Sequence, residues 1–122
     1  MHYRRLAALL ILTLAASMGW ATTPYVNNAV SVTDTSQTLT LTTAQNGLKS
    51  VLVVNKGANE VFVCPWTDTQ TAVACTSALG FELTSGESVN VTHSASEEGN
   101  GFTKLSIVCS AGETATAKVW AR

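Results

Sequence analysis

Short stretches of alternating apolar and polar residues, separated by turn residues, follow one another from residue 22 onward. Thr, Ser and Val are abundant in these stretches, and β-branched side chains fit a pleated sheet better than a helix. No stretch after Ala21 keeps the 3.6-residue apolar period of an amphipathic helix. The pattern predicts an all-β chain with strands at residues 25–32, 38–43, 48–55, 60–65, 88–93, 104–109 and 114–120, and shorter ones near 72–75 and 81–83.

The spacing of apolar residues also predicts which side chains point inward. Leu105, Ile107 and Cys109 share one phase of a strand, and in the first strand Val26, Val30 and Val32 do so. The run 51–54 is apolar at every position, which is typical of a central strand covered on both faces. Asn46-Gly47 has the composition of a type I′ hairpin turn, because both central residues of that turn need a positive φ.

Turn residues recur about every 8–12 positions between these stretches. Seven to eight short strands at this spacing are typical of an antiparallel sandwich of two sheets. We therefore expect a single two-sheet sandwich, immunoglobulin-like or jelly-roll-like, with a closed barrel as the alternative. No long repeat or second domain is expected.

The first 21 residues have the layout of a secretory signal peptide. Two arginines precede an apolar run over residues 6–16, and Gly19 and Ala21 supply small residues for cleavage after Ala21. The alternative is an uncleaved membrane anchor. An apolar helix over residues 6–21 is about 24 Å long, which is short for a hydrocarbon core of about 30 Å. We expect a signal peptide at 1–21 and an exported domain at 22–122.

The chain is sparsely charged, with 7 Lys and Arg against 8 Asp and Glu and a formal net charge of −1. Cleavage of the signal peptide removes two arginines and makes the exported region more acidic. A nucleic-acid-binding protein needs a basic surface, which this composition lacks. We expect no nucleic-acid partner, and membrane contact only through residues 1–21 if they stay uncleaved.

Three cysteines lie in the exported region, and in an oxidising compartment two of them should pair. Spacing favours a Cys64–Cys75 disulfide around Trp66, although the other pairings stay open. Cys109 is then expected to be buried as a small apolar residue, with an intermolecular bridge as the alternative. No metal site or cofactor is expected, because there is no CxxC pair and His93 is the only histidine of the exported region.

Few residues of the exported region suit catalysis. Its single histidine, His93, ends a strand, and most of its carboxylates fall in turns and loops. We therefore expect no catalytic site. The candidates for binding are the aromatic side chains Trp66, Tyr25 and Trp120, which can stack on a sugar or on a partner protein. The alternative is that they cover the core of the sandwich.

Three segments share a common pattern of strand residues and glycine turns. Residues 54–63 end a strand in Asn-x-Gly and continue into Val-Phe-Val, residues 83–89 turn through a glycine into a strand, and residues 110–119 close with Gly-x-Thr-Ala-Thr. Together they resemble small immunoglobulin-like β-sandwich accessory proteins, of the decoration type, from tailed-phage virions. This resemblance implies a non-catalytic protein that decorates or stabilises an assembly. The signal segment and the cysteines favour a relative on the bacterial surface or in the periplasm.

We therefore expect a non-catalytic exported structural or interaction module, a subunit or coat component of an extracellular or virion surface assembly. Its partner would be a protein, through self-assembly or contact with a surface partner, and the first strand can add to a neighbour's sheet. One alternative is a secreted or periplasmic module that binds carbohydrate or protein through Trp66 and residues 94–101. Another is a small hydrolase or inhibitor, for which catalysis would need His93.

Overall fold

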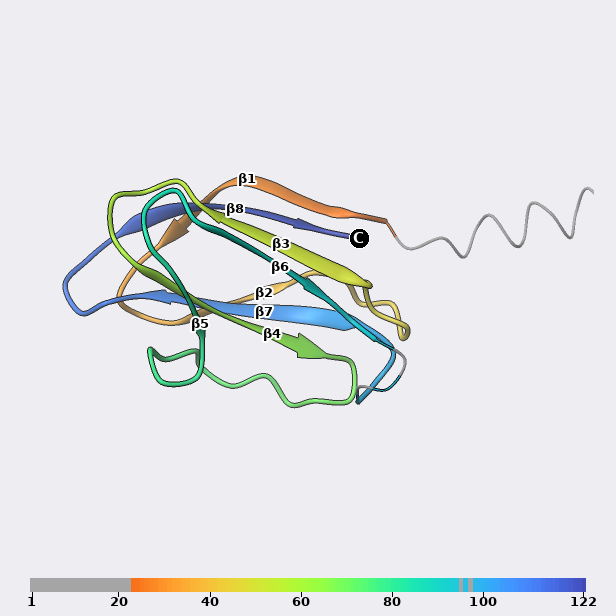
Figure 1. Cartoon of the computed structure of the whole chain (residues 1–122). Helices are drawn as coiled ribbons and strands as arrows, with labels where there is room; N and C mark the ends of the chain where they lie inside the picture. The colour runs from red at the N-terminus through yellow and green to blue at the C-terminus, as the bar shows by residue number, and fades with distance from the viewer. Residues whose placement is uncertain (1–22, 95, 97) are drawn as a thin grey trace, which may run out of the picture.

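The computed structural model describes residues 23–94, 96 and 98–122 and shows eight strands in two layers (Figure 1). One four-stranded sheet, here sheet A, has the order β1-β8-β3-β6, and the other, sheet B, has the order β2-β7-β4-β5. All strand pairs are antiparallel, so the predicted two-sheet sandwich is confirmed. The strands are β1 (Tyr25–Val32), β2 (Gln37–Thr40), β3 (Ser50–Asn55), β4 (Val61–Thr67), β5 (Phe81–Leu83), β6 (Ser88–Thr92), β7 (Phe102–Cys109) and β8 (Ala115–Ala121).

The strands pair in the jelly-roll pattern. β1 pairs with β8, β2 with β7, β3 with β6 and β4 with β5, as if one long hairpin were wrapped around the core. Every connection crosses between the sheets except the one from β4 to β5. Of the two predicted alternatives, the connectivity is therefore jelly-roll-like. The immunoglobulin-like alternative is wrong, because that fold has a different assignment of strands to its two sheets.

The Asn46-Gly47 turn joins the two sheets and does not form a hairpin. It lies between β2 of sheet B and β3 of sheet A. Gly47 has a φ of 62°, but no other residue type in the described part of the chain has a positive φ, so Asn46 lacks the type I′ conformation. The Gly47 N–H donates to the Ala44 carbonyl at 3.1 Å. The hairpin prediction is wrong because a local turn signal does not specify which sheet the next strand joins.

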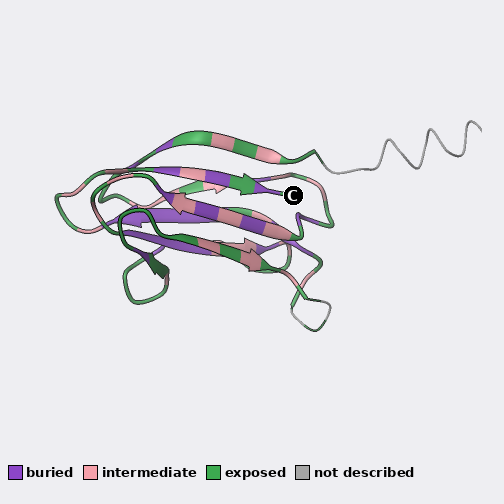
Figure 2. Cartoon of the chain, turned by 45° about the horizontal axis from the view of Figure 1, so that its top comes forward, coloured by how far each residue is buried: buried purple, intermediate pink, exposed green. Residues whose placement is uncertain are grey.

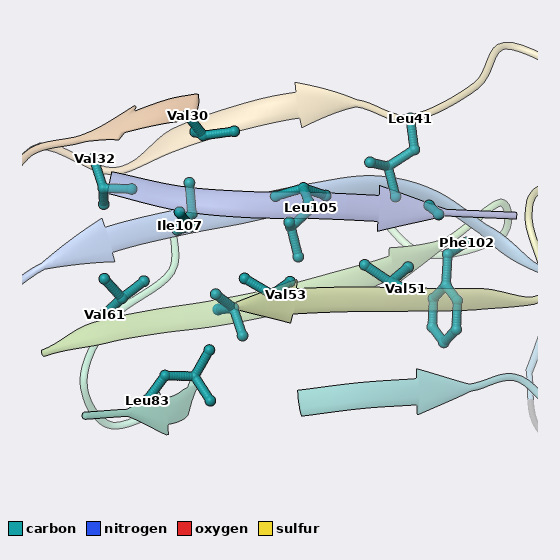
Figure 3. Packing of buried hydrophobic residues seen from close by; sticks show 14 of the residues in the cluster. Val30, Val32, Leu41, Val51, Val53, Val61, Leu83, Phe102, Leu105 and Ile107 are labelled. Atoms are coloured by element: carbon teal, nitrogen blue, oxygen red, sulfur yellow. The ribbon is translucent and has the colours of Figure 1, made fainter. Parts of the chain in front are cut away.

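Apolar side chains from both sheets fill the space between them (Figure 3). Val51 and Val53 of β3 and Leu105 and Ile107 of β7 are almost completely buried there. Side chains alternate between the two faces of a strand, so every second residue enters this core. Complete burial of such a side chain contributes about 1.5–3 kcal/mol. The predicted inward phase of Leu105, Ile107 and Cys109 is confirmed.

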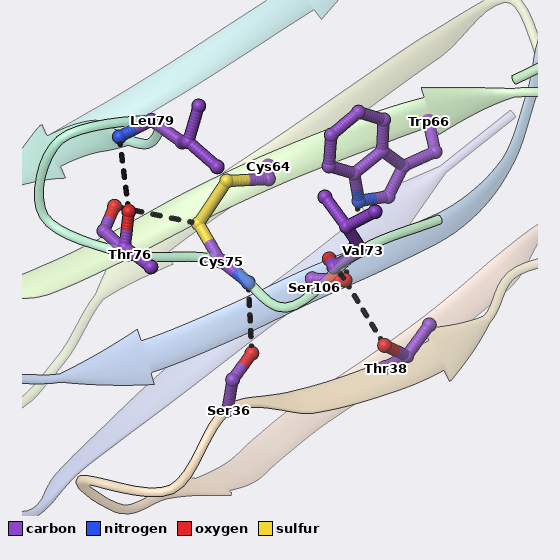
Figure 4. Close-up of a disulfide and its surroundings, with 9 residues drawn as sticks. All are labelled: Ser36, Thr38, Cys64, Trp66, Val73, Cys75, Thr76, Leu79 and Ser106. Carbon is purple, nitrogen blue, oxygen red and sulfur yellow. Dashed lines mark hydrogen bonds between the residues drawn. A yellow bond between two sulfur atoms is a disulfide. The ribbon is translucent and has the colours of Figure 1, made fainter. Parts of the chain in front are cut away.

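A second apolar cluster lies on the outer face of sheet B. Phe62, Cys64 and Val108 point away from the main core, and Trp66 packs beside them. Residues 68–80 cross this face, and a disulfide between Cys64 and Cys75 fastens them to it, with the two Cα atoms 5.6 Å apart (Figure 4). The predicted Cys64–Cys75 pairing is confirmed. Sheet B therefore carries apolar packing on both of its faces.

A fully buried amide connects β3 to β5 at one end of the sandwich. The Asn55 side chain donates to the carbonyls of Asn59 (2.7 Å) and Leu83 (2.9 Å), and its oxygen accepts from the Gly57 N–H (2.9 Å). Asn55 is 0% exposed, so water cannot replace these bonds. The side chain holds the β3–β4 turn against the end of β5.

Replacing Asn55 by Ala should lower the free energy of unfolding by about 2–3 kcal/mol, because it leaves three backbone groups without partners, one of them the buried Leu83 carbonyl. Urea unfolding of the two proteins measures the difference. Asn59→Ala is the matched control, since the Asn59 amide makes one exposed bond, to the Thr114 carbonyl. An equal loss in both variants would show that burial of the Asn55 network is unimportant.

Removing the disulfide by Cys64→Ala with Cys75→Ala should lower the free energy of unfolding by about 2–4 kcal/mol. Residues 68–80 should also become the first site of cleavage in limited proteolysis, because the disulfide fastens them to sheet B. Wild-type protein treated with a reductant is the control and should behave like the double variant. Unchanged stability and cleavage in both samples would contradict this role of the disulfide.

Candidate functional site

The outer face of sheet A carries a row of apolar side chains. Val26 lies opposite Trp120, Trp120 opposite Leu52, and Leu52 opposite Asn90, so the row crosses all four strands. Val26 is 56% exposed and Trp120 is 41% exposed. In Figure 2 the inner strands β3 and β8 alternate between buried residues and exposed or half-buried ones, whereas the edge strand β6 alternates between exposed and half-buried ones. Among the described residues, no segment lies over this row as residues 68–80 lie over sheet B.

Strand alternation and one bulge put these side chains on the outer face. In β8, Val119 and Ala121 are buried in the main core, so Trp120 between them points outward. In β1 the register shifts between Asn27 and Val30. This bulge changes the phase of the strand, so Val30 points inward while Val26 points outward. The prediction that both valines share one phase is therefore wrong.

The alternation in β3 also corrects the expectation for the apolar run at residues 51–54. Val51 and Val53 are buried in the core, but Leu52 and Val54 are only half-buried on the outer face. β3 is an inner strand of sheet A, as predicted, yet it is not covered on both faces. Two of its four apolar residues therefore belong to the outer surface.

Cations flank the apolar row. The four strands of sheet A contain no Asp or Glu, and their charged residue is Lys118, which lies opposite Val54. The Arg122 guanidinium lies over the Trp120 ring, 5.5 Å from its centroid. Such a contact at an exposed site contributes about 0.5–1 kcal/mol and orients both side chains. The outer face of sheet A thus carries a short apolar row with a positive margin.

Four of the acidic residues in the described part of the chain lie in the turns at one end of the sandwich, on the left in Figure 1. Asp34 lies in the β1–β2 turn, Glu60 just before β4, Glu87 in the β5–β6 turn and Glu113 in the β7–β8 turn. Lys56 is the cation of the same set of turns. The described part of the chain therefore separates a cationic face from an anionic end.

Two of the three predicted aromatic candidates lie at one end of sheet A but on opposite faces of it, and the third lies in sheet B. Tyr25 lies opposite Ala121, next to Trp120, at the same end of sheet A, and it packs partly against the core. Trp66 lies in sheet B and is half-buried in the second apolar cluster. Trp120 is therefore the most exposed of the three aromatic rings.

A buried serine holds Trp66 in place. The Trp66 indole N–H donates to Ser106 Oγ at 3.1 Å, and that hydroxyl donates to the Val73 carbonyl at 2.9 Å (Figure 4). The Thr38 hydroxyl lies 3.0 Å from the same oxygen and completes its bonding as a donor. This network connects β2, β4 and β7 to the segment that the disulfide fastens.

His93 contacts the loop that follows it in the sequence. Its Nε2 lies 3.1 Å from the Glu98 carbonyl oxygen, and its ring meets Phe102 edge-on with the centroids 5.9 Å apart.

In the described part of the chain, no group of three or more His, Cys, Asp or Glu side chains is placed to hold a metal ion. No helix among the described residues is long and apolar enough to cross a membrane. The predicted signal peptide lies outside the described residues.

Cys109 is the cysteine without a disulfide, and it is buried in the main core, as predicted. Burial raises the pKa of its thiol, and the nearby charges of Glu113 and Asp34 raise it further. The thiolate is the reactive form of cysteine, so this thiol should be inert in the folded protein. A bridge from Cys109 to another chain would require β7 to leave the core.

No protein-family model and no curated protein matches this chain. The resemblance to phage accessory proteins therefore stays a prediction.

The apolar row of sheet A was only partly visible in the sequence. Trp120 was a candidate from the start, whereas Val26 and Leu52 join it through a bulge and through cross-strand pairing.

Iodoacetamide at about pH 8 should leave unreduced folded protein unmodified and add one label once the protein is unfolded in urea, because only Cys109 is a free thiol. Intact mass spectrometry counts the labels. A small cysteine peptide in the same tube controls for the reagent. Labelling of the folded protein as fast as the peptide would contradict a buried thiol with a raised pKa.

Proposed function

We propose that this protein is a non-catalytic, exported structural module whose copies assemble through the outer face of sheet A. The observation that carries the proposal is the apolar row of Val26, Trp120 and Leu52, which is exposed on a sheet with a cationic margin. Exposed apolar patches that are rimmed by polar residues are typical of interaction sites, and tryptophan and arginine are enriched among the residues that dominate binding.

A second copy of the chain offers a surface that complements this face. The turns with Asp34, Glu60, Glu87 and Glu113 are anionic, whereas Lys118 and Arg122 flank the apolar row. Contact between the face of one copy and the turns of the next is heterologous, because two different surfaces meet. Repetition of such a contact produces a ring or an open filament. Either product suits a coat or subunit of a surface assembly.

The disulfide supports the exported location. A Cys64–Cys75 bond indicates an oxidising environment outside the cytoplasm. The signal-peptide pattern of residues 1–21 supports export as well, and an assembly on a cell or virion surface is consistent with both. Jelly rolls occur in capsid and lectin domains alike, so the fold alone does not select a function.

The exported, unreduced protein should assemble reversibly as its concentration rises, and the assembly should weaken with salt because charges align the copies. Its intact mass first establishes whether residues 1–21 have been removed. Sedimentation velocity then follows assembly of the wild type. Trp120→Ala should weaken assembly by at least about tenfold, because it removes the centre of the apolar row.

Two charge-reversed variants make the test specific for the proposed contact. Lys118→Glu with Arg122→Glu, and separately Glu60→Lys with Glu113→Lys, should each fail to assemble alone but should assemble when mixed, since their reversed charges match. Lys104→Glu, an exposed change on sheet B, is the matched control and should assemble like the wild type. A wild type that stays monomeric at millimolar concentration, or mixed variants that stay apart, would overturn the proposal.

A further inference from the structure

A groove opens beside β4 where β5 is too short to close the sandwich. β5 pairs only with Val61–Val63, although β4 continues to Thr67. The space beyond is about 320 Å³ and is lined by apolar side chains of Pro65, Phe81, Val91 and Phe102. Phe81 is 51% exposed, so one aromatic ring of the lining is open to solvent. A space of this size is at the lower end of the range of small-molecule sites.

Three polar side chains complete the lining of the groove. Thr67 is 6% exposed, and its hydroxyl oxygen is buried with no hydrogen-bond partner among the described residues. Gln70 Oε1 accepts from the Thr67 N–H at 3.0 Å, and its amide N–H groups have no partner in the described part of the chain. Glu98 is exposed and contributes a carboxylate at the rim. The groove therefore offers a ligand a donor at Gln70 and an acceptor at Glu98.

The two loops that form the walls are fastened to each other. The Asp68 carboxylate accepts from the Asn100 backbone N–H (2.7 Å) and from its side-chain amide (3.1 Å), and the Asp68 N–H donates to the Gly101 carbonyl (3.0 Å). The bond from the Asn100 N–H is the main cause of a lowered pKa of Asp68. The groove is thus formed before any ligand arrives, which reduces the entropy lost on binding.

The chemistry of the lining excludes several kinds of ligand. An anion would meet the Glu98 carboxylate, and a wholly apolar group would remove water from that carboxylate and from the Gln70 amide without replacing its hydrogen bonds. A peptide strand added to β4 would lack one donor at Pro65. The Val63 nitrogen faces β5, since it lies 3.0 Å from the position of a Cβ on Gly80, and alternation turns Pro65 to the same side.

We propose that this groove binds one neutral pyranose ring of a glycan. The C–H face of the ring packs on Phe81 and Val91, while its hydroxyls donate to Glu98 and accept from the Gln70 amide. Trp66 is not part of the lining. The groove is also separate from the apolar row of sheet A, so the proposed sugar site can be tested independently of the proposed assembly.

Saturation-transfer-difference NMR of the exported protein tests the site with four probes: the methyl β-pyranosides of glucose, galactose and N-acetylglucosamine and methyl α-mannopyranoside. At least one should receive saturation on its ring C–H protons, with a Kd on the order of 1 mM, which is reasonable for a ligand of one ring. Absence of saturation transfer to all four at about ten times that concentration would overturn the proposal.

Variants then locate the binding. Phe81→Ala and Glu98→Gln should each weaken the bound glycoside by at least about tenfold. Leu79→Ala should not, because Leu79 is an exposed apolar residue two positions before Phe81 but lies outside the groove. Thr67→Val should leave sugar binding unchanged and raise the Tm by about 4 °C, since it removes a buried hydroxyl that has no partner among the described residues. Equal losses in Leu79→Ala and Phe81→Ala would overturn the assignment.

Discussion

The Cys64–Cys75 disulfide determines which outer face of the sandwich stays open. It fastens residues 68–80 over sheet B, where Phe62 and Val108 would otherwise meet water. Sheet A has no such cover among the described residues, so its apolar row remains exposed beside Lys118 and Arg122. One covalent bond therefore produces the asymmetry on which the proposed assembly rests, and it also indicates the compartment in which the protein folds.

The groove is a second consequence of the same segment. Residues 68–80 connect β4 to β5 and cover the outer face of sheet B. The strand that follows them, β5, is only three residues long. At Pro65, β4 still pairs with β7 but has no strand partner on its other side, where the missing N–H of proline does no harm to the sheet. The proposed sugar site and the proposed assembly face thus both follow from the use of residues 68–80 to cover sheet B. Sheet B is packed on both faces, but β5 covers only the first part of β4. Sheet A has no cover over its outer face among the described residues.

Much of the fold follows from local chemistry and was predictable residue by residue. The alternation of Leu105, Ile107 and Cys109 identified the inner face of β7, and the short spacing favoured the Cys64–Cys75 pair. Predictions failed where the structure depends on contacts between distant segments, which a local pattern of residues does not specify. Asn46-Gly47 has the residues of a hairpin turn, but the next strand joins the other sheet. Val26 has the phase of an inner residue, but a bulge turns it outward.

The sequence by itself determined an all-β sandwich and the inner face of β7, and it favoured the Cys64–Cys75 disulfide, because alternation and chain spacing act over a few residues. Only the tertiary structure decided the jelly-roll pairing, since β1 and β8 meet from opposite ends of the domain and nothing local encodes that partnership. It also decided the candidate sites. The row from Val26 to Asn90 joins four strands, and the groove joins Thr67 to Glu98, so each exists only after distant segments have packed together.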